Sequence, residues 1–208
     1  MENAVKIIIC DTEGVSPSVA ENLPFITDGD KKAAAEYKKE SDRVSRLFSA
    51  YLKRKYIGTW LISKSGKPVA EGKYFNLSHC DGAVVLAIAD ADVGVDAEKP
   101  RKISDDLIAR VAKGKERETA GAGGFLRVWT LKESLVKAQG DGIRGDLKDV
   151  PALPENGVKT YGGEKYFSYV TEYKGFTVAV TRKGENPFSV EIQEENLPEK
   201  SENGNENE

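Results

Sequence analysis

The chain has 208 residues, of which 39% are hydrophobic, so it is long enough to bury a sizeable core. Its 31 basic and 34 acidic residues leave a net charge of −3, and this balance argues against a nucleic-acid partner. No apolar run approaches the roughly 20 residues of a membrane span, so we expect no membrane partner. Cys10 and Cys80 form no disulfide or metal-binding pattern, which favours a reduced, cytoplasmic protein.

The single histidine, His79, narrows the possible chemistry further. Zinc sites built on paired histidines are excluded, and a serine–histidine–aspartate mechanism would depend on this one residue. The chain also lacks a P-loop, a nucleophile elbow and a dinucleotide-binding fingerprint. Most of the common enzyme classes are therefore excluded.

The N-terminal part predicts a strand at residues 5–10, a polar loop to about residue 30, and then a helical region from Lys31 that ends near Gly58. One apolar stripe with a 3.6-residue period marks the helix: Val44, Leu47, Phe48, Tyr51 and Leu52. The helix is rich in lysine and arginine. Its basic face is either simply solvated or lies beside a phosphorylated ligand.

A strand at residues 59–64 and a turn at residues 66–68 follow. Residues 74–80, 83–89 and 93–98 then predict a meander of three antiparallel strands.

Asp96 and Glu98 end the third of these strands and project from the same face, because side chains alternate along a strand. Two carboxylates this close disfavour each other's ionisation unless a cation joins them. A hard divalent cation with oxygen ligands suits such a pair. The alternative is a solvated edge strand with two acidic residues.

The next segments are mostly helical. Ser104 is a candidate N-cap, residues 113–124 are glycine-rich and predict a mobile loop, and residues 129–139 predict a helix that stops at Gly140.

Glu133 and Lys137 lie four residues apart on this last helix and so share one face. They form either an ordinary helical ion pair, with Thr130 and Glu133 as a capping box, or part of a site. In a site, Glu133 would be a third carboxylate and Lys137 would approach the anionic group that the cation carries. Magnesium fits this set, since it is usually held by few protein carboxylates together with water and substrate phosphate.

A second polar cluster, residues 76–79, closes a strand at a turn. Ser78 and His79 could hold a phosphate there, with Lys67 adding a charge from the preceding turn. The alternative for His79 is a purely structural role.

The strands from Tyr166 onward repeat those from Tyr74 at an offset of about 92 residues. We therefore predict an α/β (α+β) fold of two pseudo-symmetric halves, each a small antiparallel sheet packed with helices. The expected division is residues 1–95, 96–197, and a disordered acidic tail at 198–208.

Four motifs, taken in this order, resemble the Sfp-type 4′-phosphopantetheinyl transferases: Gly66-Lys67-Pro68, Phe75-Asn76-Leu77-Ser78-His79, Val93-Gly94-Val95-Asp96-Ala97-Glu98, and Trp129-Thr130-Leu131-Lys132-Glu133-Ser134-Leu135-Val136-Lys137 followed by Gly140. The resemblance runs from about residue 31 to residue 143. It implies a fold of two pseudo-symmetric α/β halves.

The implied activity is transfer of the phosphopantetheine arm of coenzyme A to a serine of an apo acyl or peptidyl carrier protein, with release of adenosine 3′,5′-bisphosphate. The residues matching the metal ligands, which hold Mg²⁺ on the pyrophosphate, are Asp96, Glu98 and Glu133. The residues matching the contacts to coenzyme A phosphates are Lys67, Ser78, His79 and Lys137. Asp96 thus serves metal and cofactor together, and Glu133 and Lys137 are the candidate catalytic residues. The general base is either Glu133 or a metal-bound hydroxide, and a monomer is expected.

The chain departs from the family pattern in the basic helix, where Ser45-Arg46 inverts the usual arginine–hydroxyl order. Either Arg43 or Arg46 would then contact the phosphate. Val111-Ala112 also replaces a common aromatic pair, so carrier docking could differ there. The alternative function is a non-catalytic module that binds coenzyme A or a carrier protein.

Overall fold

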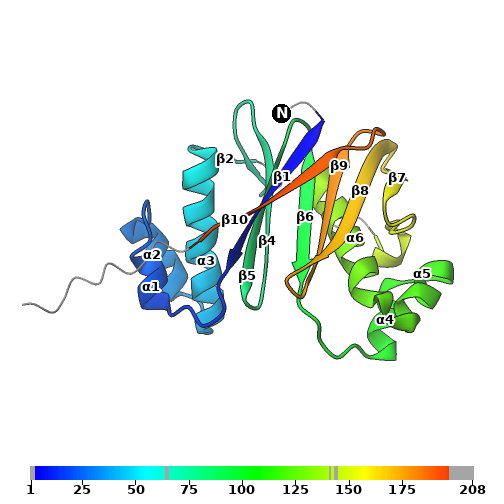
Figure 1. Ribbon diagram of the computed structural model, residues 1–208, viewed down its shortest axis with the longest axis horizontal. Helices are drawn as coiled ribbons and strands as arrows, with labels where there is room; N and C mark the ends of the chain where they lie inside the picture. The colour runs from blue at the N-terminus through cyan, green and yellow to red at the C-terminus, as the bar shows by residue number, and fades with distance from the viewer. Residues whose placement is uncertain (1–2, 64–65, 141, 143–144, 197–208) are drawn as a thin grey trace, which may run out of the picture.

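The computed structural model describes residues 3–63, 66–140, 142 and 145–196, which form two four-stranded sheets flanked by helices (Figure 1). The helices are α1 (Pro17–Glu21), α2 (Asp28–Ala35), α3 (Glu40–Leu52), α4 (Asp105–Val111), α5 (Gly114–Thr119) and α6 (Phe125–Gln139), with π-helical turns at Lys53–Ile57 and Ala120–Gly124 and a 3-10 turn at Leu147–Asp149. The strands are β1 (Ala4–Asp11), β2 (Leu61–Ile62), β3 (Pro68–Val69), β4 (Tyr74–Cys80), β5 (Ala83–Ala89), β6 (Val93–Glu98), β7 (Gly157–Tyr161), β8 (Glu164–Tyr173), β9 (Phe176–Lys183) and β10 (Ser189–Glu194). The predicted α/β class, with largely antiparallel sheets packed with helices, is confirmed.

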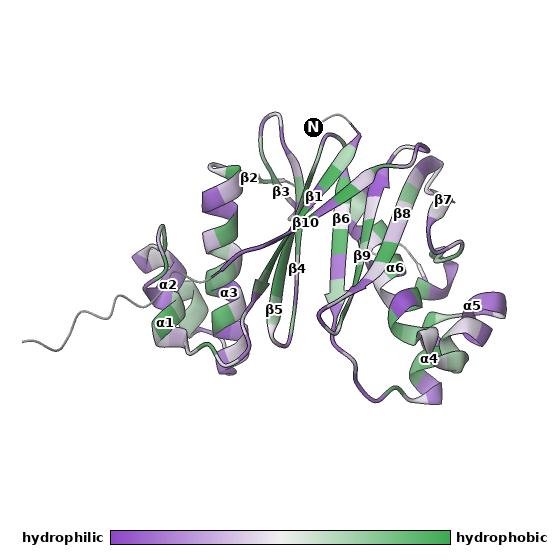
Figure 2. Cartoon of the chain, in the orientation of Figure 1, coloured by the Kyte–Doolittle hydropathy of each residue, from purple (hydrophilic) through white to green (hydrophobic). Residues whose placement is uncertain are grey.

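The elements stack in four layers, helices, sheet, sheet and helices (Figure 1). The first sheet has the order β10-β1-β5-β4 and the second β6-β9-β8-β7. An apolar core of alternating valine, isoleucine and alanine side chains from β1, β5, β6 and β9 lies between them. Hydrophobic residues accordingly concentrate on β5 and β6 (Figure 2). Among the described residues, no helix is long and apolar enough to cross a membrane.

The stripe predicted on the basic helix is confirmed. Val44, Leu47, Phe48, Tyr51 and Leu52 are all buried against the first sheet. The helical region begins slightly earlier than Lys31 and is broken at residues 36–39 into α2 and α3. The loop predicted before it also contains α1, whose first turn Ser16 caps.

The segment from residue 113 to residue 140 differs from the prediction at two points and agrees with it at a third. Residues 113–124 are not a loop: they form α5 and a π-helical turn that is kinked at Gly123, where φ is 98°. The capping box is also wrong, because α6 begins at Phe125 and the Thr130 hydroxyl donates to the Leu126 carbonyl oxygen inside the helix. Gly140 does end α6, with a left-handed φ of 86° that favours glycine.

The predicted three-strand meander is wrong in its third member. β4 and β5 form a hairpin, but β6 leaves this sheet and pairs with β9 in the second one. β10 follows β8 and β9 of the second sheet but joins the first sheet, where it lies parallel to β1. Each sheet therefore receives a strand that follows the hairpin of the other.

This exchange bears on the proposed division of the chain. Residue 95 lies within β6, which belongs wholly to the second sheet, and β10 belongs to the first. The division at residue 95 and the pseudo-symmetry of the halves stay predictions. The predicted strand at 59–64 is reduced to β2, and its last residue, like the tail at 198–208, lies outside the described residues.

Gly94 allows β6 to lie directly against α6. A Cβ atom placed on Gly94 would meet the Ser134 carbonyl oxygen at 2.0 Å, the Ala138 nitrogen at 2.3 Å and the Lys137 carbonyl carbon at 2.9 Å. All three are backbone atoms, so no rotamer change can relieve the clash. Any larger residue must push the strand and the helix apart.

We expect Gly94→Ala to lower the free energy of unfolding by about 3 kcal/mol, at the upper end for overpacked sites, because two backbones must separate. Urea denaturation measures this. The control is Gly121→Ala, where no atom lies within 4 Å of the added Cβ, and a change below about 1 kcal/mol is expected. Equal effects from both variants would contradict the close-approach argument.

A buried carboxylate, Glu195, anchors the end of β10 to the helical layer. It accepts hydrogen bonds from the hydroxyls of Tyr51 and Tyr56 and pairs with Lys55. Its own backbone N–H donates to the Ile9 carbonyl oxygen at 2.8 Å. Burial alone would raise the pKa of Glu195, but the three donors outweigh it and hold the pKa below the ordinary value of 4.5.

Because the folded-state pKa of Glu195 is depressed, its contribution to stability is present above pH 4.5 and is lost as the pH falls through the folded-state value. We expect Glu195→Gln to cost about 2 kcal/mol at pH 7 and to flatten the decline in stability below pH 4.5. Denaturation at a series of pH values tests this, with the exposed Glu71→Gln as control. An unchanged acid profile in Glu195→Gln would refute the assignment.

Candidate active site

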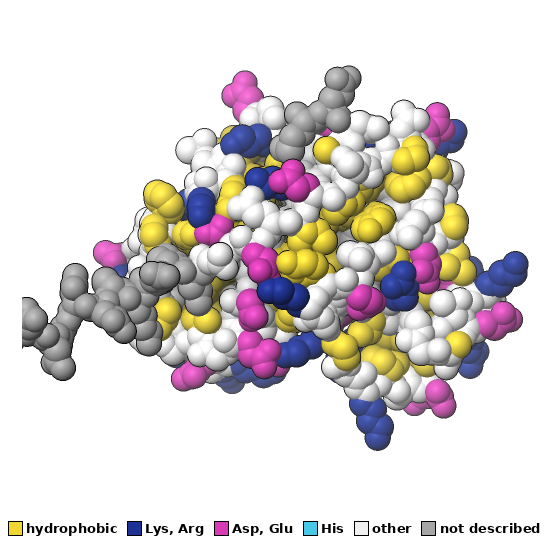
Figure 3. All heavy atoms as spheres, in the orientation of Figure 1, with side chains coloured by type: hydrophobic (Ala, Val, Ile, Leu, Met, Phe, Trp, Pro, Cys, Tyr) yellow, Lys and Arg dark blue, Asp and Glu magenta, His cyan; other side chains and the backbone are white. Residues whose placement is uncertain are grey.

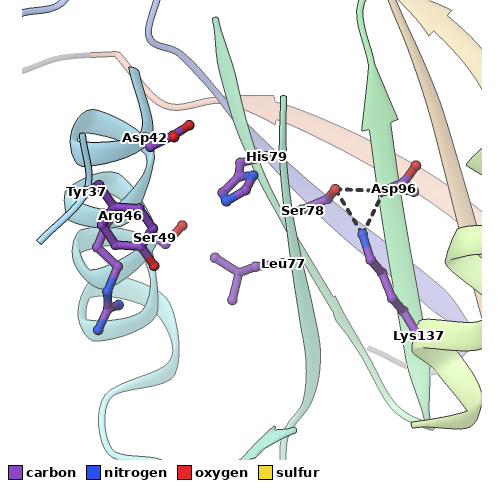
Figure 4. A pocket seen from close by; sticks show the side chains of 9 residues that line it. All are labelled: Tyr37, Asp42, Arg46, Ser49, Leu77, Ser78, His79, Asp96 and Lys137. Atoms are coloured by element: carbon purple, nitrogen blue, oxygen red, sulfur yellow. Dashed lines mark hydrogen bonds and ion pairs between the residues drawn. The ribbon is translucent and has the colours of Figure 1, made fainter. Parts of the chain in front are cut away.

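A cleft of about 620 Å³ opens between α3 and the edge where β4 and β6 meet. Its lining residues are Tyr37, Asp42, Arg46, Ser49, Leu77, Ser78, His79, Asp96 and Lys137 (Figure 4). Leu77 and His79 point from β4 toward α3, whereas Ser78 between them points the opposite way, toward Asp96 (Figure 4). This is the alternation that a strand imposes.

Asp96 is the most buried charge of the cleft, with only 5% of its surface exposed. One carboxylate oxygen, Oδ1, accepts from the Ser78 hydroxyl at 2.8 Å and from the Lys137 ammonium at 2.6 Å. The Lys137 ammonium also lies 3.1 Å from the Ser78 oxygen, so the three polar groups close a triangle (Figure 4). The other oxygen, Oδ2, is buried and has no hydrogen-bond partner among the residues that the structure describes.

Glu98 and Glu133 complete the predicted carboxylate set. Burial, followed by the negative charge of Asp96, raises the pKa of both side chains above 4.5. The Lys137 ammonium opposes this rise at Glu133, and Arg101, at 3.8 Å from Glu98, opposes it at Glu98. The three carboxylates therefore share one electrostatic environment, although they come from two different elements.

This environment fits a hard divalent cation. Within the described part of the chain, Oδ2 of Asp96 has no partner, and burial together with the charge of Asp96 raises the pKa of Glu98 and Glu133. Both features favour a positive charge at this position. As the side chains stand, no three His, Cys, Asp or Glu residues in the described part of the chain converge tightly enough to hold a metal ion. The donor set is suitable, but its side chains would have to draw together.

The structure separates the predicted phosphate contacts. Ser78, His79 and Lys137 line the cleft, His79 being exposed there. Lys67 lines another cavity of about 200 Å³, where its ammonium lies 3.4 Å from the Ala138 carbonyl oxygen near the end of α6. Burial lowers the pKa of Lys67 there.

The structure also separates the two candidate arginines. Arg46 lines the cleft, whereas the Arg43 side chain donates to the Tyr37 carbonyl oxygen at 2.8 Å.

The sequence did not single out Asp42 and Ser49, which line the cleft beside Arg46. Their spacing of four and three residues places all three on one face of α3, and that periodic polar stripe is the signal that could have found them. Tyr37 precedes α3 in the short break after α2, and no sequence pattern marks it.

Comparisons with known proteins agree with this geometry. The family model described as "4′-phosphopantetheinyl transferase superfamily" matches residues 92–181, which include β6, α6 and all three carboxylates. The 4′-phosphopantetheinyl transferase psf-1 of Bacillus pumilus is 26% identical over 181 residues, 76% of each chain. The transferase gsp of Aneurinibacillus migulanus is 33% identical over 86 residues, 38% of this chain and 36% of its own. The transferase Sfp of Bacillus subtilis (strain 168) is 31% identical over 80 residues, 34% of each chain.

The matched segment carries the β6 and α6 residues of the cleft, and the first of these relatives extends the similarity over three quarters of the sequence. This chain is therefore similar to the 4′-phosphopantetheinyl transferase superfamily, and the similarity includes the segment that forms β6 and α6.

Proposed function

We propose that this protein transfers the 4′-phosphopantetheine arm of coenzyme A to a serine hydroxyl of an apo acyl or peptidyl carrier protein and releases adenosine 3′,5′-bisphosphate. The observation that carries the proposal is the Asp96–Lys137–Ser78 triangle at the wall of a large open cleft, in which Asp96 and Lys137 belong to the segment that matches the family. A charged cluster of this kind suits a substrate with several phosphates.

Coenzyme A would lie in the cleft between α3 and β4. Arg46 and Lys137 supply positive charge from opposite walls, and His79 adds donors at the rim. Arg46 suits a phosphate because its guanidinium can donate two hydrogen bonds at once. Lys67, which the resemblance also links to the phosphates, lies in the other cavity, so we assign it to the margin of the site.

The side chains of Asp96, Glu98 and Glu133 would hold Mg²⁺. When bound, the metal would neutralise charge on the pyrophosphate of coenzyme A. The partnerless Oδ2 of Asp96 supports this assignment.

The chain's own residues supply the remaining chemistry. In the transfer, a bond forms between the serine oxygen and the attacked phosphorus, and the bond from that phosphorus to the adenosine bisphosphate breaks. Lys137 would place its ammonium on the phosphate oxygens, where negative charge must be stabilised. Glu133 is the candidate acceptor for the serine proton, because it lies one helical turn before Lys137 on the same face of α6.

A non-catalytic binding module is the less favoured function. A purely binding module needs no catalytic carboxylate, yet Glu98 and Glu133 share the electrostatic environment of Asp96, which lines the cleft. A cytoplasmic location, a monomeric state and the absence of nucleic-acid or membrane partners remain predictions. Acidic and basic side chains are interspersed on the face in Figure 3, which agrees with a surface that has no single-sign field.

The test of the function is intact-mass spectrometry of an apo acyl or peptidyl carrier protein incubated with this protein, coenzyme A and Mg²⁺. We expect a gain of about 340 Da on the carrier, the mass of the phosphopantetheine arm. Glu133→Gln should slow transfer at least about 100-fold, because a general base typically contributes that much. Asp96→Asn and excess chelator should also abolish the gain.

The control is Glu185→Gln, an exposed carboxylate paired with Lys165, which should transfer at the normal rate. Full activity in chelator would refute the metal assignment. No mass gain on a panel of acyl and peptidyl carriers, with coenzyme A still bound, would favour the binding module.

The two arginines give a further prediction. Arg46→Ala should raise the KM for coenzyme A about tenfold with little change in kcat, since it removes a charge-assisted contact to bound substrate. Arg43→Ala should change the KM less than about twofold, because Arg43 is engaged with the Tyr37 carbonyl. Steady-state kinetics distinguish them, and a larger effect at Arg43 would reverse the assignment.

A further inference from the structure

The positively charged Lys137 side chain contacts Asp96, the residue that we propose as a metal ligand. The Lys137 ammonium lies 2.6 Å from Asp96 Oδ1, and the Asp96 side chain is only 7% exposed. The same ammonium lies 3.1 Å from the Ser78 oxygen, which itself donates to Oδ1. Oδ1 of Asp96 thus accepts hydrogen bonds from both the Ser78 hydroxyl and the Lys137 ammonium.

Glu133 is close to Lys137 in the sequence, but the ion pair that Lys137 forms in the structure is with Asp96. Glu133 precedes Lys137 by four residues on α6, the favoured spacing and orientation for a helical ion pair. Lys137 instead pairs across to β6, where Asp96 is the more buried of the two acids. A buried carboxylate requires a positive partner, whereas a better-solvated one does not, so burial selects the partner.

The backbone holds this arrangement in place. The Lys137 carbonyl carbon lies 2.9 Å from the position of a Cβ on Gly94, two residues before Asp96. The root of the Lys137 side chain is therefore fixed against β6. Its ammonium can leave Asp96 only by rotation of the flexible four-carbon stem.

Such a rotation leads into the cleft. The Lys137 side chain is 28% exposed and is one of the residues that line the cleft (Figure 4). A divalent cation on Asp96 would repel an ammonium left at 2.6 Å from the same carboxylate, because like charges in a partly buried site are weakly screened. An anionic ligand in the cleft would give the displaced ammonium a new partner.

We propose that Lys137 is the counter-cation of Asp96 in the ligand-free protein and competes there with a divalent cation, so that metal binding depends on an anion that takes over the ammonium. The proposal rests on the proposed metal-binding role of Asp96. Metal and phosphate-bearing ligand are then coupled, each strengthening the binding of the other by the same factor. Lys137 thereby keeps the buried carboxylate neutralised when no substrate is present.

The test is the affinity for Mn²⁺ alone, measured by electron paramagnetic resonance of the free ion, with no coenzyme A or carrier. We expect Lys137→Met to bind Mn²⁺ about tenfold more tightly than the wild-type protein, because the competing charge is gone. Lys137→Gln should behave in the same way, since it keeps a hydrogen-bond donor but removes the charge. Unchanged or weaker Mn²⁺ binding in both variants would overturn the proposal.

Two controls sharpen the result. Lys165→Met removes one positive charge at an exposed pair with Glu185 and should leave Mn²⁺ affinity unchanged. If Lys165→Met raised the affinity for Mn²⁺ equally, the change in net charge alone would explain the effect, and the proposal would be overturned. Asp96→Asn combined with Lys137→Met should lose the tight binding; if it does not, the ion is not on Asp96, and the proposal fails.

Stability provides a second measurement if Lys137→Met is unstable without metal. The variant leaves Asp96 uncompensated, so Mn²⁺ should raise its melting temperature more than that of the wild type. An equal or smaller rise would count against the competition. No assay here uses transfer activity, so a failed carrier assay with tightened Mn²⁺ binding would reject the enzyme function while this proposal stands.

Discussion

The contact of two backbones at Gly94 is the constraint on which the site depends. β6 and α6 approach so closely there that the position of a Cβ lies 2.0 Å from a carbonyl oxygen of the helix. This approach brings Asp96 on the strand within 2.6 Å of Lys137 on the helix. With a longer distance between the two elements, the lysine could not neutralise a carboxylate that is almost fully buried.

The same region joins the two sheets. Asn76 on β4 accepts a hydrogen bond from the Val95 backbone N–H on β6 at 3.0 Å, and Ser78, two residues further along β4, donates to Asp96. The edges of the two sheets are thus linked through side chains instead of a backbone ladder. β10 adds a second link on the far side, because it crosses to the first sheet and ends at the buried Glu195. The cleft lies between α3 and this junction of β4 with β6.

Electrostatics then determine what the cleft can do. Three carboxylates from β6 and α6 share one environment, and burial together with the negative charge of Asp96 raises the pKa of Glu98 and Glu133. Lys137 compensates part of this charge, and Arg46 lines the same cleft from α3. A site with clustered acids on one wall and cations on both suits a metal-assisted reaction of a phosphorylated substrate, which is the activity proposed for this protein.

The sequence by itself determined those features that depend on residues close together in the chain. The apolar stripe of α3, the glycine end of α6 and the pairing of Asp96 with Glu98 on one strand face follow from helical and strand periodicity. The ordered motifs also identified Ser78, His79 and Lys137, which the structure brings into one cleft. Local patterns carry this information because neighbours along the chain determine it.

Only the tertiary structure decided what depends on contacts between distant segments. The hydropathy of β6 is compatible with pairing to β5 or to β9, and the close fit of Gly94 to α6 is visible only once strand and helix are packed. Residues 113–124 look like a loop because glycine is a poor helix former, yet they form α5 and a π-helical turn that pack beside α6. Lys137 pairs with Asp96 instead of Glu133, and Lys67 lies apart from the cleft, because burial and distance in the folded molecule override spacing in the sequence.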